Sequence, residues 1–152
     1  TRLAEHGLRL VYGTGDVGLM GIVARAAQAA GGEIFGVIPE HLEKREVGKS
    51  DLSSYVVTET MHERKKVMLY NADAVVVLPG GMGSLDELFE AVTWAQLGLH
   101  EKPIVILNTE GYWKPLRALI DHIVAEDFAG EAIRDALIWA DTPEQALAAL
   151  SA

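Results

Sequence analysis

Hydrophobic residues along the chain fall into short β-branched runs that alternate with longer segments of helical periodicity. Such runs are typical of buried parallel strands, and they predict strands at residues 8–12, 33–38, 55–57, 74–77, 104–107 and 137–140. Apolar residues at helical spacing predict helices over residues 19–30, 60–70, 88–97 and 115–128, with a last helix after residue 142. This alternation indicates an α/β fold, with a central, mostly parallel sheet flanked by helices in three layers and right-handed crossovers.

Short polar motifs predict where several helices begin and end. A capping box places Ser or Thr before the helix and Glu or Gln three residues later, and residues 60–63, 84–87 and 142–145 have this pattern. Gly7 and Gly98 follow helical segments, where glycine commonly ends a helix. Because residues 1–7 resemble the last turns of a helix, we expect further residues upstream of them. Residues 42–54 are polar and predict a surface loop that acts as a lid or a partner surface.

Length and charge narrow the classes of protein that the chain can be. A chain of 152 residues predicts one domain over residues 1–152. The net charge of −9 argues against a nucleic-acid polymer or an anionic membrane as the main partner. There is no cysteine, and the five histidines lack the spacing of metal ligands, so we expect no metal site. With no visible signal peptide and no apolar run near the ~18 residues of a membrane span, we expect a cytoplasmic protein.

The segment over residues 78–87 has the strongest functional pattern. It carries Pro79, Gly80 and Gly81 between a predicted strand and a predicted helix. Such a turn exposes backbone N–H groups at the positive end of a helix dipole, which suits a phosphate. A second interpretation stays open, in which the glycines are ordinary turn residues and Ser84 with Glu87 forms a capping box.

A second glycine-rich turn, over residues 13–18, matches the pattern G-x-G-x-x-G between a strand and a helix. This context is that of a dinucleotide-binding turn, and the spacing makes Glu40 a candidate partner for a ribose. Two other interpretations stay open: a turn that contacts some other nucleotide, and a turn that only packs the helix against the sheet.

Basic residues gather early in the helix predicted from residue 60. Arg64, Lys65 and Lys66 form either a solvated helix face or a clamp for an anionic substrate. Residues 108–113 follow a buried strand at its carboxyl end, where open α/β sheets place ligand sites. Two glycine-rich turns and a basic helix start at this edge predict a phosphate-bearing small molecule as the ligand.

Two motifs together resemble a known family. Residues 61–65 and 79–87 are similar to the paired signature M-H-x-R-K and P-G-G-x-G-T-x-x-E of the LOG ("Lonely guy") proteins, which are cytokinin riboside 5′-monophosphate phosphoribohydrolases. The resemblance continues over residues 11–21 and 93–103, and so covers nearly the whole chain. Members of this family are often mislabelled lysine decarboxylases, but nothing in the sequence supports pyridoxal phosphate or another cofactor.

The resemblance implies a Rossmann-like fold, a homodimer or a hexamer, and cleavage of the N-glycosidic bond of cytokinin riboside 5′-monophosphates and AMP. The products would be the free base and ribose 5-phosphate. Catalysis would fall to Arg64 and Glu87. Substrate would be bound by the two glycine-rich turns and the start of the basic helix, at Gly13, Gly15, Met61, Lys65, Gly80, Gly81, Gly83 and Ser84.

The sequence departs from the family pattern at three places. Ser84 stands for the usual threonine and keeps its hydroxyl, and Thr14 stands for the middle glycine of a usual Gly-Gly-Gly. The opening strand of the family, its Gly-Ser loop and most of the first helix have no counterpart in this sequence. Because that strand lies centrally in the family's sheet, we expect the working protein to carry those residues.

Two alternative functions fit the same residues. A general nucleoside 5′-monophosphate nucleosidase would use the same catalytic pair without preferring a prenylated base. A non-catalytic protein similar to molybdenum-cofactor carriers would bind its ligand through similar glycine turns without turning over AMP.

Overall fold

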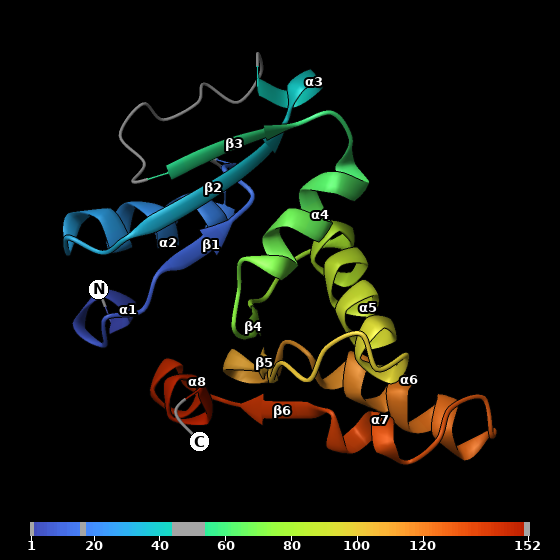
Figure 1. Cartoon of the computed structure of the whole chain (residues 1–152). Helices are drawn as coiled ribbons and strands as arrows, with labels where there is room; N and C mark the ends of the chain where they lie inside the picture. The colour runs from blue at the N-terminus through green and yellow to red at the C-terminus, as the bar shows by residue number, and fades with distance from the viewer. Residues whose placement is uncertain (1, 16–17, 44–53, 151–152) are drawn as a thin grey trace. The chain divides into compact units, whose positions relative to one another are not determined.

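The computed structural model describes residues 2–15, 18–43 and 54–150 (Figure 1). It divides into two compact units, Thr1–Ala72 and Asp73–Ala152, and each is described by itself. In the described part of the chain, no helix combines the length and the apolar character that a membrane span requires.

The first unit is built on a parallel three-stranded sheet in the order β1-β2-β3. Its elements are α1 (Arg2–Glu5), β1 (Leu10–Tyr12), α2 (Gly18–Ala29), β2 (Ile34–Pro39), α3 (Glu40–Glu43), β3 (Ser54–Thr58) and α4 (Met61–Tyr70). In register, Leu10 pairs with Ile34 and Phe35 pairs with Ser54. Helix α2 packs against β1 and β2, and α4 packs against β2 and β3. Helix α4 therefore lies beside β2. Strand β2 pairs with β1, which leads into the first glycine-rich turn.

The second unit is built on another parallel sheet, in the order β4-β5-β6. Its elements are β4 (Val75–Val77), α5 (Met82–Gln96), β5 (Ile104–Leu107), the 3₁₀ turn η1 (Thr109–Gly111), α6 (Lys114–Ala125), α7 (Ala132–Asp135), β6 (Leu137–Ala140) and α8 (Pro143–Leu150). In register, Ile104 pairs with both Val75 and Leu137. The carboxyl ends of the three strands therefore share one edge of the sheet.

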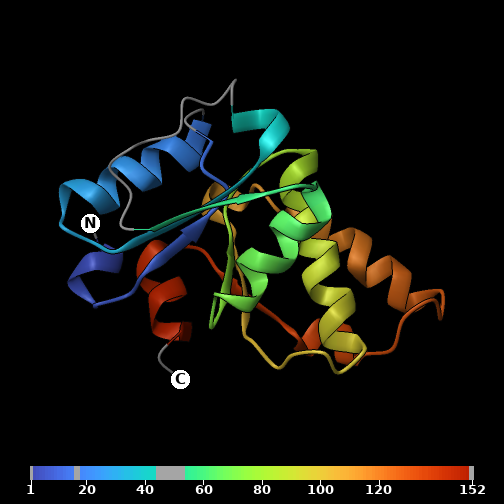
Figure 2. The same ribbon diagram turned by 45° about the horizontal axis from the view of Figure 1, so that its top comes forward.

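Strand β5 is buried on both faces, as its unbroken apolar sequence predicts. Ile104 and Ile106 belong to a core shared with residues of α5 and α6, whereas Val105 and Leu107 belong to a core shared with Ala146 of α8. Figure 2 shows α8 on one side of these strands and α5 with α6 on the other. This double cover holds the carboxyl end of β5 in place.

The predicted α/β class with parallel strands is confirmed. All six predicted strands are present, and β5 and β6 have the predicted bounds. Within the described residues the strands form two sheets of three. The short helices α3 and α7 were not predicted, and residues 42–43 end α3 instead of belonging to the predicted 42–54 loop, whose residues 44–53 lie outside the described residues. The single domain over residues 1–152 stays a prediction.

Of the three predicted capping boxes, one forms completely and a second forms only its first hydrogen bond. Thr60 Oγ1 accepts from the Glu63 N–H at 3.1 Å, and Glu63 Oε2 accepts from the Thr60 N–H at 3.2 Å. At α8, Thr142 Oγ1 accepts from the Gln145 N–H at 3.2 Å, but the Gln145 side chain accepts from Asp141 instead of Thr142. The predicted terminal glycines also hold, because Gly7 and Gly98 have φ of +66° and +69°.

We expect Thr60→Ala to lower the free energy of unfolding by about 1 kcal/mol, because the Glu63 N–H loses its cap. Urea denaturation measures this change. Thr93→Ala, at an exposed position inside α5, is the matched control. It should leave the free energy of unfolding unchanged or slightly raised, because alanine favours helix. Equal losses in both variants would contradict a capping role for Thr60.

Candidate active site

The turn after β1 is buried and lies against an arginine side chain from α4. Gly13, Thr14 and Gly15 are all buried. A Cβ placed on Gly13 would lie 1.4 Å from Nη2 of Arg64 and 2.5 Å from its Cζ, so the guanidinium would have to shift to make room for it. Glycine at position 13 therefore leaves the space that the guanidinium occupies.

Arg64 is a buried charge held by backbone carbonyls. Its side chain lies in the first turns of α4 and the residue is 8% exposed. Nε donates to the carbonyl oxygen of Val37 in β2 at 3.2 Å, and Nη2 donates to that of Gly13 at 3.2 Å. Burying a guanidinium is unfavourable unless it is hydrogen-bonded, and charge-assisted bonds of this kind are strong. The fold thus fixes a cation at the carboxyl end of β1.

The three basic residues of α4 have different environments. Arg64 is buried, Lys65 is half-buried, and Lys66 is exposed with Nζ 5.7 Å from the centre of the Tyr70 ring. The interpretation of the cluster as one solvated face is therefore wrong for Arg64. Met61, one turn earlier, is 37% exposed. The substrate contacts assigned to Lys65 and Met61 stay predictions.

Thr14 occupies a backbone conformation that favours glycine. Its φ is +60°, and its hydroxyl donates to the carbonyl oxygen of Gly13 at 2.8 Å. This left-handed conformation costs a β-branched residue roughly 1–3 kcal/mol. The same Gly13 oxygen accepts from Arg64, so two donors converge on it. The threonine that departs from the family pattern therefore takes part in fixing this turn.

The dinucleotide interpretation of the first glycine-rich turn is not tested by the structure. Glu40 is exposed at the start of α3, directly after β2. Residues 16–17 of the glycine motif lie outside the described residues. The ribose contact of Glu40 stays a prediction.

The second glycine-rich turn opens the longest helix of the described chain. Helix α5 begins at Met82, and its first internal hydrogen bond runs from the Leu85 N–H to the Gly81 carbonyl oxygen at 3.2 Å. The N–H groups of residues 82–84 precede that bond and have no acceptor in the helix itself. Met82 and Gly83 are exposed. This end of α5 is suited to an anion by its donors and its dipole.

The predicted capping box at Ser84 and Glu87 is wrong. Gly81 is the N-cap of α5 and no side chain caps it, so Ser84 lies third in the helix and Glu87 lies in its second turn. Glycine is accepted at an N-cap. Helix α5 therefore begins three residues earlier than a cap at Ser84 would place its start. Ser84 instead packs on Gly80, where an added Cβ would lie 2.1 Å from Ser84 Oγ. Capping therefore gives no reason for Glu87, which is half-buried.

A tyrosine from the loop after β5 reaches the same turn and was not among the predicted site residues. The Tyr112 hydroxyl donates to the Gly80 carbonyl oxygen at 2.8 Å. Residues 108–113 as a group were predicted to lie at a ligand-binding edge, with none of them singled out. No periodicity links two residues that are 32 positions apart, so only three-dimensional structure could reveal this contact.

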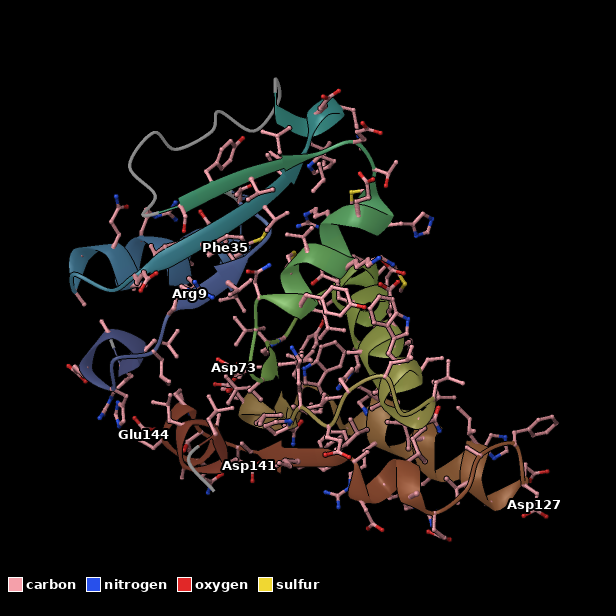
Figure 3. All side chains as sticks on the ribbon, viewed as in Figure 1. Arg9, Phe35, Asp73, Asp127, Asp141 and Glu144 are labelled. Carbon is pink, nitrogen blue, oxygen red and sulfur yellow. The ribbon has the colours of Figure 1, made fainter. Side chains whose placement is uncertain are left out.

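Asn108 organises the loop that carries Tyr112. Its Oδ1 accepts from the Trp113 N–H at 2.8 Å, and its Nδ2 donates to Asp141 Oδ1 at 3.2 Å. Asp141 follows β6, where Figure 3 labels it. The Asn108 N–H also donates to the Ala140 carbonyl oxygen at 2.7 Å. The ends of β5 and β6 are thereby tied to the loop.

The structure groups the predicted residues within each unit. In the first unit, Gly13 contacts Arg64 directly, and Gly15, Met61 and Lys65 are their near neighbours in sequence. In the second unit, the start of α5 gathers Gly80, Gly81, Gly83 and Ser84, with Glu87 one turn further along the helix. The pairing of Arg64 with Glu87 joins residues of different units and stays a prediction. Among the described residues, no cluster of three or more histidine or carboxylate side chains could hold a metal ion.

Fold and site define an α/β protein with parallel strands and glycine-rich strand-to-helix turns of the kind that bind phosphate groups. A family model described as "Possible lysine decarboxylase" matches residues 20–150. Over 143 residues, the chain is 45% identical to "Cytokinin riboside 5′-monophosphate phosphoribohydrolase LOG" of Oryza sativa subsp. japonica. The match covers 94% of this chain and 59% of that protein.

An Arabidopsis thaliana relative, "Cytokinin riboside 5′-monophosphate phosphoribohydrolase LOG2", is 40% identical over 146 residues, which are 96% of this chain and 68% of the relative. The chain belongs to this LOG family, as the paired motifs predicted. It spans about three fifths of the length of the rice relative.

Proposed function

We propose that the protein hydrolyses the N-glycosidic bond of cytokinin riboside 5′-monophosphates, and also of AMP. Relatives that match 94–96% of the chain carry the name of this activity, which supports the proposal. The structural observation that carries it is the burial of Arg64 against the Gly13 carbonyl oxygen. This supports the proposal because the carboxyl ends of parallel strands are where α/β sheets bind their ligands, and a guanidinium there suits an anionic ligand.

In the proposed reaction, water adds to C1′ of the ribose while the bond from C1′ to N9 breaks. The leaving base takes the bonding electrons and a proton, and ribose 5-phosphate keeps the hydroxyl. The transition state resembles an oxocarbenium ion, as in glycosidases. The Glu87 carboxylate orients or deprotonates the water and offsets the developing positive charge. Arg64 holds the ribose or phosphate, or stabilises the leaving base.

The phosphate of the substrate is assigned to the start of α5. The backbone N–H groups of Gly81, Gly83 and Ser84 donate to its oxygens, assisted by Lys65. Gly13 and Gly15 border the nucleotide, and Met61 contacts the base. No cofactor and no metal ion enters this scheme.

Release of free base from AMP and from isopentenyladenosine monophosphate, measured side by side on the full-length protein, tests the proposal. We expect faster release from the prenylated nucleotide, and Arg64→Ala should lower both rates by about 10²-fold or more, because a charged contact to the reacting nucleotide is lost. Arg25→Ala, an exposed arginine of α2, is the matched control and should keep the wild-type rates.

The other outcomes select the alternatives. Equal release from both nucleotides would favour the general nucleosidase. A nucleotide that binds without any release of base would favour the carrier. Wild-type rates in Arg64→Ala would contradict the role of Arg64. The homodimer or hexamer and the cytoplasmic location stay predictions, and light scattering of the purified protein tests the first.

A further inference from the structure

We propose that Tyr112 is a positioning residue, which fixes the peptide between Gly80 and Gly81 so that the Gly81 N–H points toward the phosphate of the substrate. The evidence is the hydrogen bond of 2.8 Å from the Tyr112 hydroxyl to the Gly80 carbonyl oxygen. The inference rests on the proposed function, in which the Gly81 N–H binds that phosphate.

In a planar trans peptide, the direction of the C=O group fixes the direction of the N–H group. The C=O of Gly80 and the N–H of Gly81 belong to one peptide unit and point in opposite directions. Glycine on both sides permits this peptide to rotate more easily than any other pair of residues would. The rotated peptide would present a carbonyl oxygen to the phosphate in place of a donor, and two negative groups would then face each other. A bond that holds the Gly80 oxygen prevents this exchange.

Contacts with the core of the second unit hold the Tyr112 ring in place. Its ring packs edge-on against Trp113, with ring centres 4.8 Å apart and planes at 85°. Trp113 is 5% exposed and belongs to the main core of the second unit. The backbone N–H of Trp113 donates to Oδ1 of Asn108 at the end of β5. Although Tyr112 is 52% exposed, its hydroxyl is therefore carried by a part of the chain that is tied to the sheet.

The Gly80–Gly81 turn is also restricted by a contact with Ser84. Ser84 packs on Gly80 closely enough to exclude any side chain there. That contact restricts the size of residue 80, but it does not hold the carbonyl oxygen. Loss of the Tyr112 hydroxyl should therefore leave the fold intact and change only the orientation of the Gly80–Gly81 peptide.

The test is Tyr112→Phe in the full-length protein, with Tyr70→Phe as the matched control, because Tyr70 is an exposed tyrosine at the end of α4. In ¹H–¹⁵N spectra without ligand, we expect a shifted or exchange-broadened Gly81 amide in Tyr112→Phe alone. Titration with inorganic phosphate should show about 3- to 10-fold weaker binding, the size expected for one hydrogen bond. For AMP, KM should rise by a similar factor while kcat changes little.

Each result decides the inference. A wild-type Gly81 amide together with unchanged phosphate affinity in Tyr112→Phe would overturn it, even if the wild-type protein cleaves AMP. A lower kcat at unchanged KM would also overturn it, because it would place Tyr112 in the chemical step. A perturbed Gly81 amide with weaker phosphate binding would support it, even in a protein that releases no base and so lacks the proposed activity.

Discussion

Glu87→Gln should lower kcat for base release from AMP by about 10²-fold or more, because an amide cannot act as a general base or offset a developing positive charge. The side chain keeps its shape, so KM should change little. Glu87 lies in the second turn of α5, whose N-cap Gly81 has no side-chain cap. The melting temperature should therefore show no loss of the size that a missing cap would cause.

Asp86→Asn is the matched control, since Asp86 is the neighbouring carboxylate on the same helix and is exposed. It should keep wild-type kcat. The catalytic assignment would be abandoned if Glu87→Gln retained wild-type turnover, or if both variants lost turnover equally. Steady-state kinetics with calorimetric melting on the same samples measures both quantities.

Gly13→Ala should abolish most activity, although it adds only one methyl group and removes no functional group. The new Cβ would lie 1.4 Å from Arg64 Nη2, so the guanidinium has to leave its place. Arg64 would lose its bond to the Gly13 carbonyl oxygen. We expect kcat/KM for AMP to fall by about 10²-fold, and the free energy of unfolding to fall by about 1–3 kcal/mol because buried polar groups lose partners.

A double-mutant cycle shows whether Gly13 acts through Arg64. If it does, Gly13→Ala adds almost nothing to the loss already caused by Arg64→Ala, because contacting residues are not additive. Additive losses would refute that route. Gly130→Ala is the control, because an added Cβ there meets nothing within 4 Å. It should keep wild-type kinetics and stability.

The strands were predicted well because each contains a short apolar run, and such runs are typical of buried parallel strands. Strand β5 is buried on both faces, and its four residues are all apolar, so period and composition agree. Helix starts were harder. Thr60 with Glu63 and Ser84 with Glu87 have the same pattern, yet only the first pair caps a helix. Two glycines before Ser84 permit an earlier start, and a local pattern cannot choose between two permitted starts.

The candidate site was predictable as far as its residues occur in motifs. Arg64 and Gly13 were each identified, but their contact was not, because it joins residues 51 positions apart. Tyr112 lies in no phosphate-binding pattern and contacts the backbone of Gly80, not a side chain. Contacts to main-chain atoms leave little trace in sequence, since every residue offers the same carbonyl oxygen.

The anchoring of Arg64 by carbonyl oxygens has a consequence for how the site tolerates mutational change. Val37 contributes only its main-chain oxygen, so this bond sets no requirement on its side chain, which is constrained instead by its complete burial. Gly13 also accepts a hydrogen bond through its carbonyl oxygen, and its missing side chain leaves the space that the guanidinium occupies. Two hydrogen bonds of equal length thus differ in sensitivity: a side chain at residue 13 displaces the guanidinium, whereas the bond to Val37 does not depend on which side chain residue 37 carries.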